Sequence, residues 1–252
     1  MQLTVLGSGT FQPTPTRGFS GYFVKVKDTN ILLDAGSGQL RQLARIGITA
    51  DDIDIIFLSH YHIDHTAEIA PILFAKRHSL KVPKKHLSIY GPPELETLFN
   101  GLVQLYADSV EPDGYQLSLF EYSDSEIELN GFRVRVLPVQ HTENSFGIRI
   151  EENNGAVLAY SGDSDFCENL ITLCKNSDLA VIECSFPNEY KQPGHLTPRE
   201  VGHIADKAGC KKVLLTHFYP ITEKTNIIQD CAAYYKGTVL IAEELMPMLI
   251  TK

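Results

Sequence analysis

Cysteine is sparse in this sequence and gives no sign of a disulfide framework. The five cysteines are an odd number and contain no C-x-x-C pair, which fits reduced and mostly buried thiols. No apolar run approaches the roughly twenty residues that a membrane-spanning helix needs. The segment from Met1 to Leu6 reads as a strand and lacks the basic start and cleavage site of a signal peptide. We therefore expect a cytoplasmic protein that has no membrane partner.

The sequence also has fewer basic than acidic residues. Lys and Arg number 22 against 31 Asp and Glu, which gives a formal net charge of −9. This balance argues against a broad surface that follows nucleic-acid phosphates. One basic patch either contacts a polyanionic substrate or is a solvated face; it comprises Lys76, Arg77, His78, Lys81, Lys84, Lys85 and His86. No Ser/Gly/Pro-rich linker or repeat divides the chain, so we expect one domain over residues 1–252.

Histidine, in contrast, is concentrated in one short segment. His60, His62, Asp64 and His65 follow the apolar run at residues 53–58. Imidazole nitrogens and carboxylate oxygens suit zinc and related divalent ions. In an extended segment His60 and His62 point the same way, and a turn into a helix can bring Asp64 and His65 to a neighbouring point. The segment therefore predicts a metal site, and its two groups of ligands suggest two adjacent ions.

Three further residues of these types stand where apolar runs end. His141 follows residues 132–140, Asp163 follows residues 156–162, and His217 follows residues 212–216. Each alone could be an ordinary polar residue at a strand end. Together with the first segment they indicate that a sheet edge delivers all of them to one metal site.

In this set of residues and in their order, the chain resembles the metallo-β-lactamase superfamily. The resemblance implies that His60, His62 and His141 surround one metal ion, that Asp64, His65 and His217 surround a second, and that Asp163 bridges the two. It also implies an α/β fold, an αββα sandwich of two mixed β-sheets flanked by helices. Two divalent ions are expected, zinc first, with manganese and iron as alternatives because availability decides among metals at such sites.

The second half resembles the ribonuclease Z branch of phosphodiesterases. The similarity lies in residues 179–186, in the Gly-His-Leu-Thr-Pro run at 194–198, and in residues 211–218. Members of that branch have a Gly/Pro-rich arm that grips transfer RNA. In the sequence this arm lies between the strand that carries the histidine equivalent to His141 and the strand that carries the bridging aspartate. Here the interval from His141 to Asp163 holds only an acidic turn at 151–155. The resemblance thus supports phosphodiester chemistry better than it supports a transfer RNA substrate.

Three carboxylates and one histidine are expected to assist the metals. Asp64 would bind the second ion and orient or deprotonate the attacking water. His195 is not needed as a ligand, so we assign it to protonating the leaving oxygen, with Glu183 as its hydrogen-bond partner. Asp34, at a strand end, is expected to orient a ligand histidine.

Three functions stay open at this point. The leading one is hydrolysis of a small-molecule or nucleotide phosphodiester, with RNA as a further substrate. The second is hydrolysis of a carbonyl ester, lactone or thioester by the same metals. The third is a non-catalytic metal-binding scaffold, which the complete ligand set disfavours. The sequence leaves the natural substrate and the choice between a monomer and a homodimer open.

Apolar periodicity predicts the elements of this sandwich. Strands are expected at residues 3–6, 22–26, 31–34, 55–58, 87–90, 116–122, 126–129, 132–139, 146–151, 157–160, 179–183 and 213–216. Helices are expected at residues 39–46, 63–74, 93–106, 165–175, 198–208 and 226–236.

Overall fold

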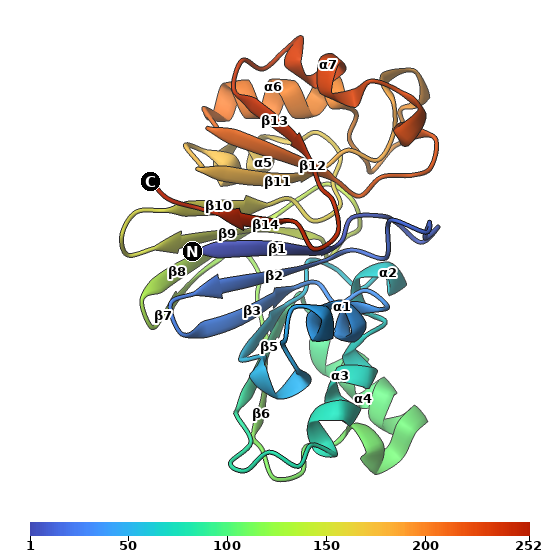
Figure 1. Ribbon diagram of the computed structural model, residues 1–252, viewed down its shortest axis with the longest axis vertical. Coiled ribbons are helices and arrows are strands. Elements are labelled where there is room, and N and C mark those ends of the chain that lie inside the picture. The colour runs from blue at the N-terminus through green and yellow to red at the C-terminus, as the bar shows by residue number, and fades with distance from the viewer.

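Two seven-stranded β-sheets pack face to face, and helices cover their outer faces (Figure 1). The computed structural model describes residues 1–252. The expected αββα sandwich of two mixed sheets is confirmed, because both sheets contain parallel and antiparallel neighbours. None of the helices combines the length and apolarity that crossing a bilayer requires.

The first sheet holds the N-terminal strands in the order β14-β1-β2-β3-β4-β5-β6. Its strands are β1 Gln2–Gly7, β2 Gly21–Val26, β3 Thr29–Leu33, β4 Ile55–Phe57, β5 Leu87–Gly91, β6 Leu117–Glu121 and β14 Pro247–Leu249. The helices that accompany it are α1 Gln39–Arg45, η1 Ala50–Asp52, α2 Ile63–Thr66, α3 Ile69–Arg77, α4 Leu95–Tyr106 and η2 Ala107–Val110.

The second sheet has the order β13-β12-β11-β10-β9-β8-β7. Its strands are β7 Ser125–Leu129, β8 Phe132–Pro138, β9 Phe146–Glu152, β10 Val157–Tyr160, β11 Leu179–Glu183, β12 Lys212–Thr216 and β13 Thr238–Ile241. The accompanying helices are α5 Glu168–Cys174, η3 Asn188–Tyr190, α6 Pro198–Ala208, η4 Thr222–Lys224 and α7 Ile227–Ala232.

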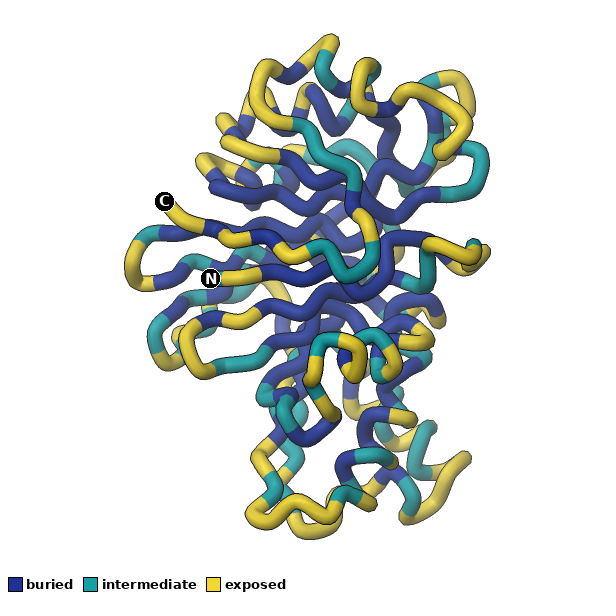
Figure 2. Tube along the Cα trace, in the orientation of Figure 1, coloured by how far each residue is buried: buried dark blue, intermediate teal, exposed yellow.

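Burial follows these layers (Figure 2). The largest apolar cluster, of 25 buried residues, joins the inner faces of the two sheets. Of the two smaller clusters, one lies between the first sheet and its helices and the other between the second sheet and its helices. Strands β4, β10 and β11 are buried at every position because helices cover the face that the partner sheet does not. Such strands read as continuous apolar runs, so residues 55–58, 157–160 and 179–183 were recognisable in the sequence.

One expected helix is two helices in the structure. The predicted helix at residues 63–74 is interrupted between α2 and α3. The carbonyl oxygen of His65 accepts from the backbone N–H of Ala35, and Pro71 has no N–H to continue the ladder. The interruption separates the short helix that carries Asp64 and His65 from the longer one that packs on the sheet.

Two strands were missed by the periodicity argument. Both β13 and β14 are short, and β14 returns the C-terminus to the first sheet, where Leu249 pairs with Gln2. The two termini therefore lie on adjacent strands (Figure 1).

Three lysines of the basic patch make contacts within the chain. Lys76 is fully buried and donates to the carbonyl oxygen of Asp51. Lys81 and Lys85 form ion pairs with Asp52 and Asp54. These three lysines therefore have partners within the chain, which favours the solvated-face interpretation over a contact with a polyanion.

Helix α6 positions the loop that carries His195, and its contact with α7 depends on a glycine. The helix begins with a capping box between Thr197 and Glu200. A Cβ added at Gly202 would lie 2.7 Å from the carbonyl oxygen of Cys231 and 2.9 Å from the Cβ of Tyr234. Gly101, in α4, would meet nothing within 4 Å.

These two helical glycines should respond to alanine in opposite directions. Gly202→Ala forces α6 and α7 apart and should lower the free energy of unfolding by about 1–3 kcal/mol, the usual cost of overpacking. Gly101→Ala should raise it by about 0.5–1 kcal/mol, because alanine loses less backbone entropy in a helix. Urea denaturation followed by circular dichroism measures both. Equal destabilisation by the two variants would contradict this account of the α6–α7 contact.

Candidate metal centre

The loop after β4 and the first turn of α2 hold four of the expected ligands. His60, Asp64 and His65 are buried, and His62 is exposed at the N-cap of α2 with an extended backbone. The extended segment and the helical turn bring the four side chains into the two neighbouring ligand groups, as their spacing predicts. The backbone N–H of Ser59, just before them, donates to Asp34 and anchors the loop to the end of β3.

The other three residues follow β8, β10 and β12, at the same edge of the second sheet. His141 follows β8, Asp163 follows β10, and His217 follows β12. Gly162 has a φ of +59°, and a Cβ there would lie 2.7 Å from the Cβ of Ser59, so only glycine allows this approach of the two sheets. His217 itself adopts a φ of 59°, a conformation that costs a non-glycine residue free energy and that the surrounding structure must enforce.

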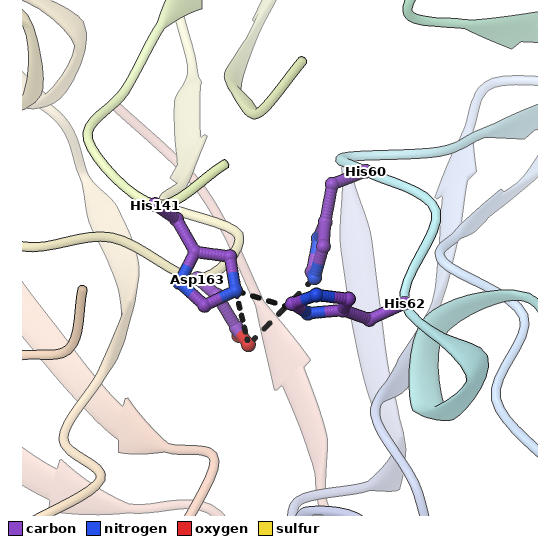
Figure 3. A group of neighbouring side chains, drawn as sticks. All are labelled: His60, His62, His141 and Asp163. Carbon is purple, nitrogen blue, oxygen red and sulfur yellow. Dashed lines mark hydrogen bonds and ion pairs between the residues drawn. The ribbon is translucent and has the colours of Figure 1, made fainter. Parts of the chain in front are cut away.

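The structure brings His60, His62, His141 and Asp163 together into a first group (Figure 3). His141 Nε2 lies 3.0 Å from His62 Nδ1. Asp163 Oδ2 lies 3.8 Å from the Nε2 atoms of both His60 and His141. Three imidazoles and one carboxylate oxygen therefore converge on one point.

Asp64, His65 and His217 form a second group beside the first. The Nε2 atoms of His65 and His217 are 3.3 Å apart, and Asp64 Oδ2 lies 3.5 Å from His217 Nε2. Asp163 Oδ1 is 3.3 Å from both of these nitrogens. Asp163 thus turns one carboxylate oxygen to each group.

Hydrogen bonds on the far side of four rings decide which nitrogen faces the centre. In each ring Nδ1 is hydrogen-bonded to an oxygen, which turns Nε2 toward the site, where its lone pair can bind a cation. The pairs are His60 with Ser59 Oγ at 3.0 Å, His65 with Asp34 Oδ2 at 2.6 Å, His141 with the Gly194 carbonyl at 2.8 Å, and His217 with Ser185 Oγ at 2.9 Å. The expected contact between Asp34 and a histidine is therefore present, and its partner is His65.

This arrangement fits divalent cations. The Nε2 atoms of His65 and His217 lie 3.3 Å apart, so a proton or a metal cation must lie between their lone pairs. The separation matches the edge of a tetrahedron whose metal–nitrogen bonds are about 2.0 Å, which is about 3.3 Å. Two buried atoms, His60 Nε2 and Asp163 Oδ1, make no hydrogen bond at all. Buried polar atoms normally have a partner, and a cation would supply it for both.

The charges of the neighbours shape the ionisation of Asp163. Burial raises the pKa of this carboxyl, but His217, His65 and His60 together outweigh burial and hold the pKa well below its usual range. Asp163 is therefore a carboxylate, the form that binds cations.

His195 and Glu183 form a pair at the border of the centre. Glu183 ends β11, and its Oε1 lies 2.9 Å from His195 Nδ1. Burial is the largest influence on His195 and lowers its pKa, but the hydrogen bond and charge of Glu183 outweigh burial and raise the pKa to about 9. His195 lies beside His141 and His217, with ring centroids 4.9 and 5.8 Å away. The expected partnership of these two residues is present in the structure.

The supporting residues Ser59, Ser185 and Gly194 were not foreseen. Ser185 Oγ donates to Glu183 Oε2 and is also hydrogen-bonded to His217 Nδ1, so it links the Glu183–His195 pair to His217. The period of two at a strand end places Ser185 on the same side as Glu183, which is the one signal the sequence offered. The role of the Gly194 carbonyl depends on the tertiary fold and has no sequence signal.

An aromatic cluster borders the centre on the side of His195. Phe186 and Tyr219 stack with centroids 4.4 Å apart, and Phe11 meets Tyr219 edge-on at 5.5 Å. Phe186 and Tyr219 lie 5.7 and 6.0 Å from His195. Phe11 is 55% exposed. Burial raises the pKa of Tyr219 to about 12, so its ring is uncharged at neutral pH.

Comparisons with known proteins agree with this geometry. A family model described as "Beta-lactamase superfamily domain" matches residues 29–218. The chain is 30% identical over 247 residues to the probable metallo-hydrolase YhfI of Bacillus subtilis, which covers 96% of this chain and 97% of that protein. It is 26% identical, over an alignment of 298 residues, to ribonuclease Z of Myxococcus xanthus, with 96% and 95% covered.

Solved structures extend the comparison to the fold. The crystal structure of Bacillus subtilis YhfI superposes with a TM-score of 0.84 at 26% identity and covers 98% of both chains. The human short-form tRNase Z superposes with a TM-score of 0.82 at 24% identity and covers 100% of both chains.

The pairing of His195 with Glu183 can be tested in the metal-free protein. His195 should titrate with a pKa of about 9, so its ring stays charged as the pH rises past the ordinary histidine value of about 6.5. Glu183→Gln removes the carboxylate charge and should move this pKa down toward the ordinary value. NMR titration of the imidazole resonances measures the shift. The exposed Glu189→Gln is the matched control, and an unchanged His195 pKa in Glu183→Gln would refute the pairing.

Proposed function

Because this chain belongs to the metallo-β-lactamase superfamily and is a metallo-hydrolase of its ribonuclease Z-like branch, we propose that it uses two divalent ions to hydrolyse phosphodiester bonds of nucleotides or RNA. The observation that carries the proposal is the carboxylate of Asp163, whose two oxygens face two separate groups of ligands. A single ion would need only one of these groups.

The proposed ligand sets follow the two groups. His60, His62 and His141 hold one ion, Asp64, His65 and His217 hold the other, and Asp163 is shared. Zinc is the first choice, because nitrogen-rich tetrahedral sites suit it, and manganese or iron would also accept these ligands. When bound, such ions lower the pKa of water and offset the negative charge that develops on a phosphoryl group.

The residues of the chain supply the remaining steps. Asp64 has a carboxylate oxygen next to His217, and in the proposal its other oxygen orients the attacking water. His195 donates a proton to the leaving oxygen. Glu183 holds the Nδ1 side of that ring, which keeps Nε2 for the substrate and favours the charged form.

The proton on His195 favours a phosphodiester over a carbonyl substrate. An alkoxide is a poor leaving group and gains most from a positioned acid, whereas an activated lactone or thioester gains less. In the metal-free protein the carboxylate of Glu183 raises the pKa of His195 and so favours its acid form. Hydrolysis of a carbonyl ester remains the second candidate, since it needs the same metals.

The aromatic cluster of Phe11, Phe186 and Tyr219 supports a substrate that carries a nucleobase. Nucleobases stack on exposed aromatic rings with about 1–3 kcal/mol each. The cluster lies next to His195, so a stacked base would place its phosphate near the two ligand groups.

A short turn argues against transfer RNA as the principal substrate. Strands β9 and β10 are joined directly, with a tight turn between Glu152 and Val157. Asn153, Asn154 and Gly155 at this turn leave no room for a gripping arm. Small nucleotide diesters and short RNA are therefore the proposed substrates.

We also propose that residues 1–252 form one hydrolase domain that acts in the cytoplasm. The apolar cluster between the sheets supports the first point, because it draws on strands from both halves of the chain. A homodimer remains an alternative to a monomer. Analytical ultracentrifugation of the metal-loaded protein distinguishes the two states.

Metal content and turnover should separate two variants. Asp163→Asn removes a ligand charge from both groups and should lower the metal content, measured by plasma emission spectrometry, together with activity. His195→Ala should keep the wild-type metal content and lose on the order of 10²-fold in turnover, the usual scale for a general acid.

The assay uses bis(p-nitrophenyl) phosphate beside a lactone and a precursor transfer RNA. Turnover of the lactone alone would reverse the ranking of the two enzymatic functions. A protein that binds two ions but turns over none of the three substrates would favour the non-catalytic metal-binding scaffold. Loss of metal from His195→Ala would show that His195 is a ligand and not an acid.

The aromatic cluster predicts a specific effect on KM. Phe11→Ala should raise KM about tenfold for the p-nitrophenyl ester of thymidine 5′-phosphate and leave kcat nearly unchanged, because stacking contributes to ground-state binding. The same ester of abasic deoxyribose 5-phosphate is the control substrate, and its KM should not change. Phe74→Ala, a remote and half-exposed phenylalanine, is the control variant. An equal rise for both substrates would exclude base stacking on Phe11.

A further inference from the structure

A second polar site lies on the outer face of the second sheet, away from the candidate metal centre. Strands β7, β8 and β9 and the C-terminal end of α5 line a half-open cavity of about 370 Å³. Val134 and Val136 of β8 face the core between the sheets, so Arg133 and Arg135 face this cavity. We call it the arginine cavity.

The lining of the arginine cavity is charged and contains no hydrophobic residue. Four cations face two carboxylates, Glu126 and Glu151, which leaves a local charge of +2 in a chain whose formal net charge is −9. The cations are Arg133, Arg135, Arg149 and Lys175. Glu151 is shared, since one oxygen lies 3.6 Å from both Arg133 and Arg149.

Two of these arginines oppose each other across the sheet. Arg135 of β8 is directly paired with Arg149 of β9. Like charges at such paired positions destabilise a sheet. Arg149 is held by the carbonyl oxygens of Leu173 and Lys175 at 3.0 and 2.8 Å. Its position is therefore set by the end of α5, and it cannot turn away from Arg135.

Arg135 is the group that lacks a partner. Its buried Nε atom makes no hydrogen bond, and none of its nitrogens forms an ion pair within 4.0 Å. A buried donor without an acceptor costs about 1–3 kcal/mol. An anion in the cavity would satisfy this donor and relieve the repulsion from Arg149 at the same time.

We propose that the arginine cavity binds the phosphate group of a small phosphorylated molecule, with Arg135 and Arg149 as its main contacts. Two guanidinium forks match the tetrahedral oxygens of a phosphate, and the charge of +2 balances a terminal phosphate dianion. The volume suits a small ligand. No aromatic side chain lines the cavity, so a nucleobase would find nothing to stack on. This site is independent of the proposed hydrolysis.

Titration calorimetry with inorganic phosphate on the metal-loaded protein tests the proposal. The wild-type protein should show a binding event that Arg135→Gln weakens at least about tenfold, because the paired guanidinium contacts are lost. Arg135→Lys keeps the charge without the fork and should bind with intermediate affinity. Arg41→Gln removes the same charge from an exposed position on α1 and should bind as the wild type does. Asp163→Asn, which disrupts the metal centre, should retain the event.

Thermal melting provides a second readout that does not depend on calorimetry. Without phosphate, Arg135→Gln should melt no lower than the wild type, because it removes the repulsion from Arg149. It should also lose the rise in melting temperature that phosphate gives the wild type and Arg41→Gln.

Three results would overturn the proposal. Phosphate affinity that is equal in the wild type and Arg135→Gln would show that the cavity does not bind phosphate. Loss of the event in Asp163→Asn would assign it to the metal centre. An Arg135-dependent affinity for single-stranded RNA without terminal phosphates, and none for inorganic phosphate, would make the cavity part of an RNA surface instead.

Discussion

The carboxylate of Asp163 lies between two groups of imidazoles, and the loops at this edge of the two sheets serve to hold it there. A buried carboxylate is costly unless positive charge surrounds it. Here the compensation comes from His65 and His217 on one side and from His60 and His141 on the other. His60 Nε2 and Asp163 Oδ1 still lack hydrogen-bond partners, and cations bound among these rings would supply them.

Rigidity at this edge comes from the atoms behind the rings. Asp34 accepts from His65, Ser59 and Tyr160 and so ties the end of β3 to the loop after β4 and to β10 of the other sheet. Asp34 has a φ of 57°, and His217 has a similar value. These left-handed conformations cost free energy. The hydrogen bonds of the two residues hold them in place, which is how strained loops keep ligands at the separations that a cation needs.

The two sheets contribute different residues to the metal centre. The first supplies His60, His62, Asp64 and His65 from one continuous segment, and the second supplies its residues singly from the ends of β8, β10, β11 and β12. The large core between the sheets keeps the two contributions in register. The outer face of the second sheet contributes no residue to the metal centre, and the arginine cavity lies on that face.

Much of this could be predicted from the sequence, for a physical reason. Strands buried on both faces leave continuous apolar runs, and the short spacing from His60 to His65 constrains where those side chains point whatever surrounds them. These patterns, together with the resemblance to the metallo-β-lactamase superfamily, predicted which seven residues lie together, and the structure brings them together and pairs His195 with Glu183. Other features depend on contacts between distant segments. The break between α2 and α3 arises because Ala35 takes the carbonyl of His65, and β14 exists as a strand because β1 offers it an edge. The burial of Lys76 and the pairing of Arg135 with Arg149 were likewise decided by the tertiary structure, since a charged residue in a sequence does not reveal which charge it will face.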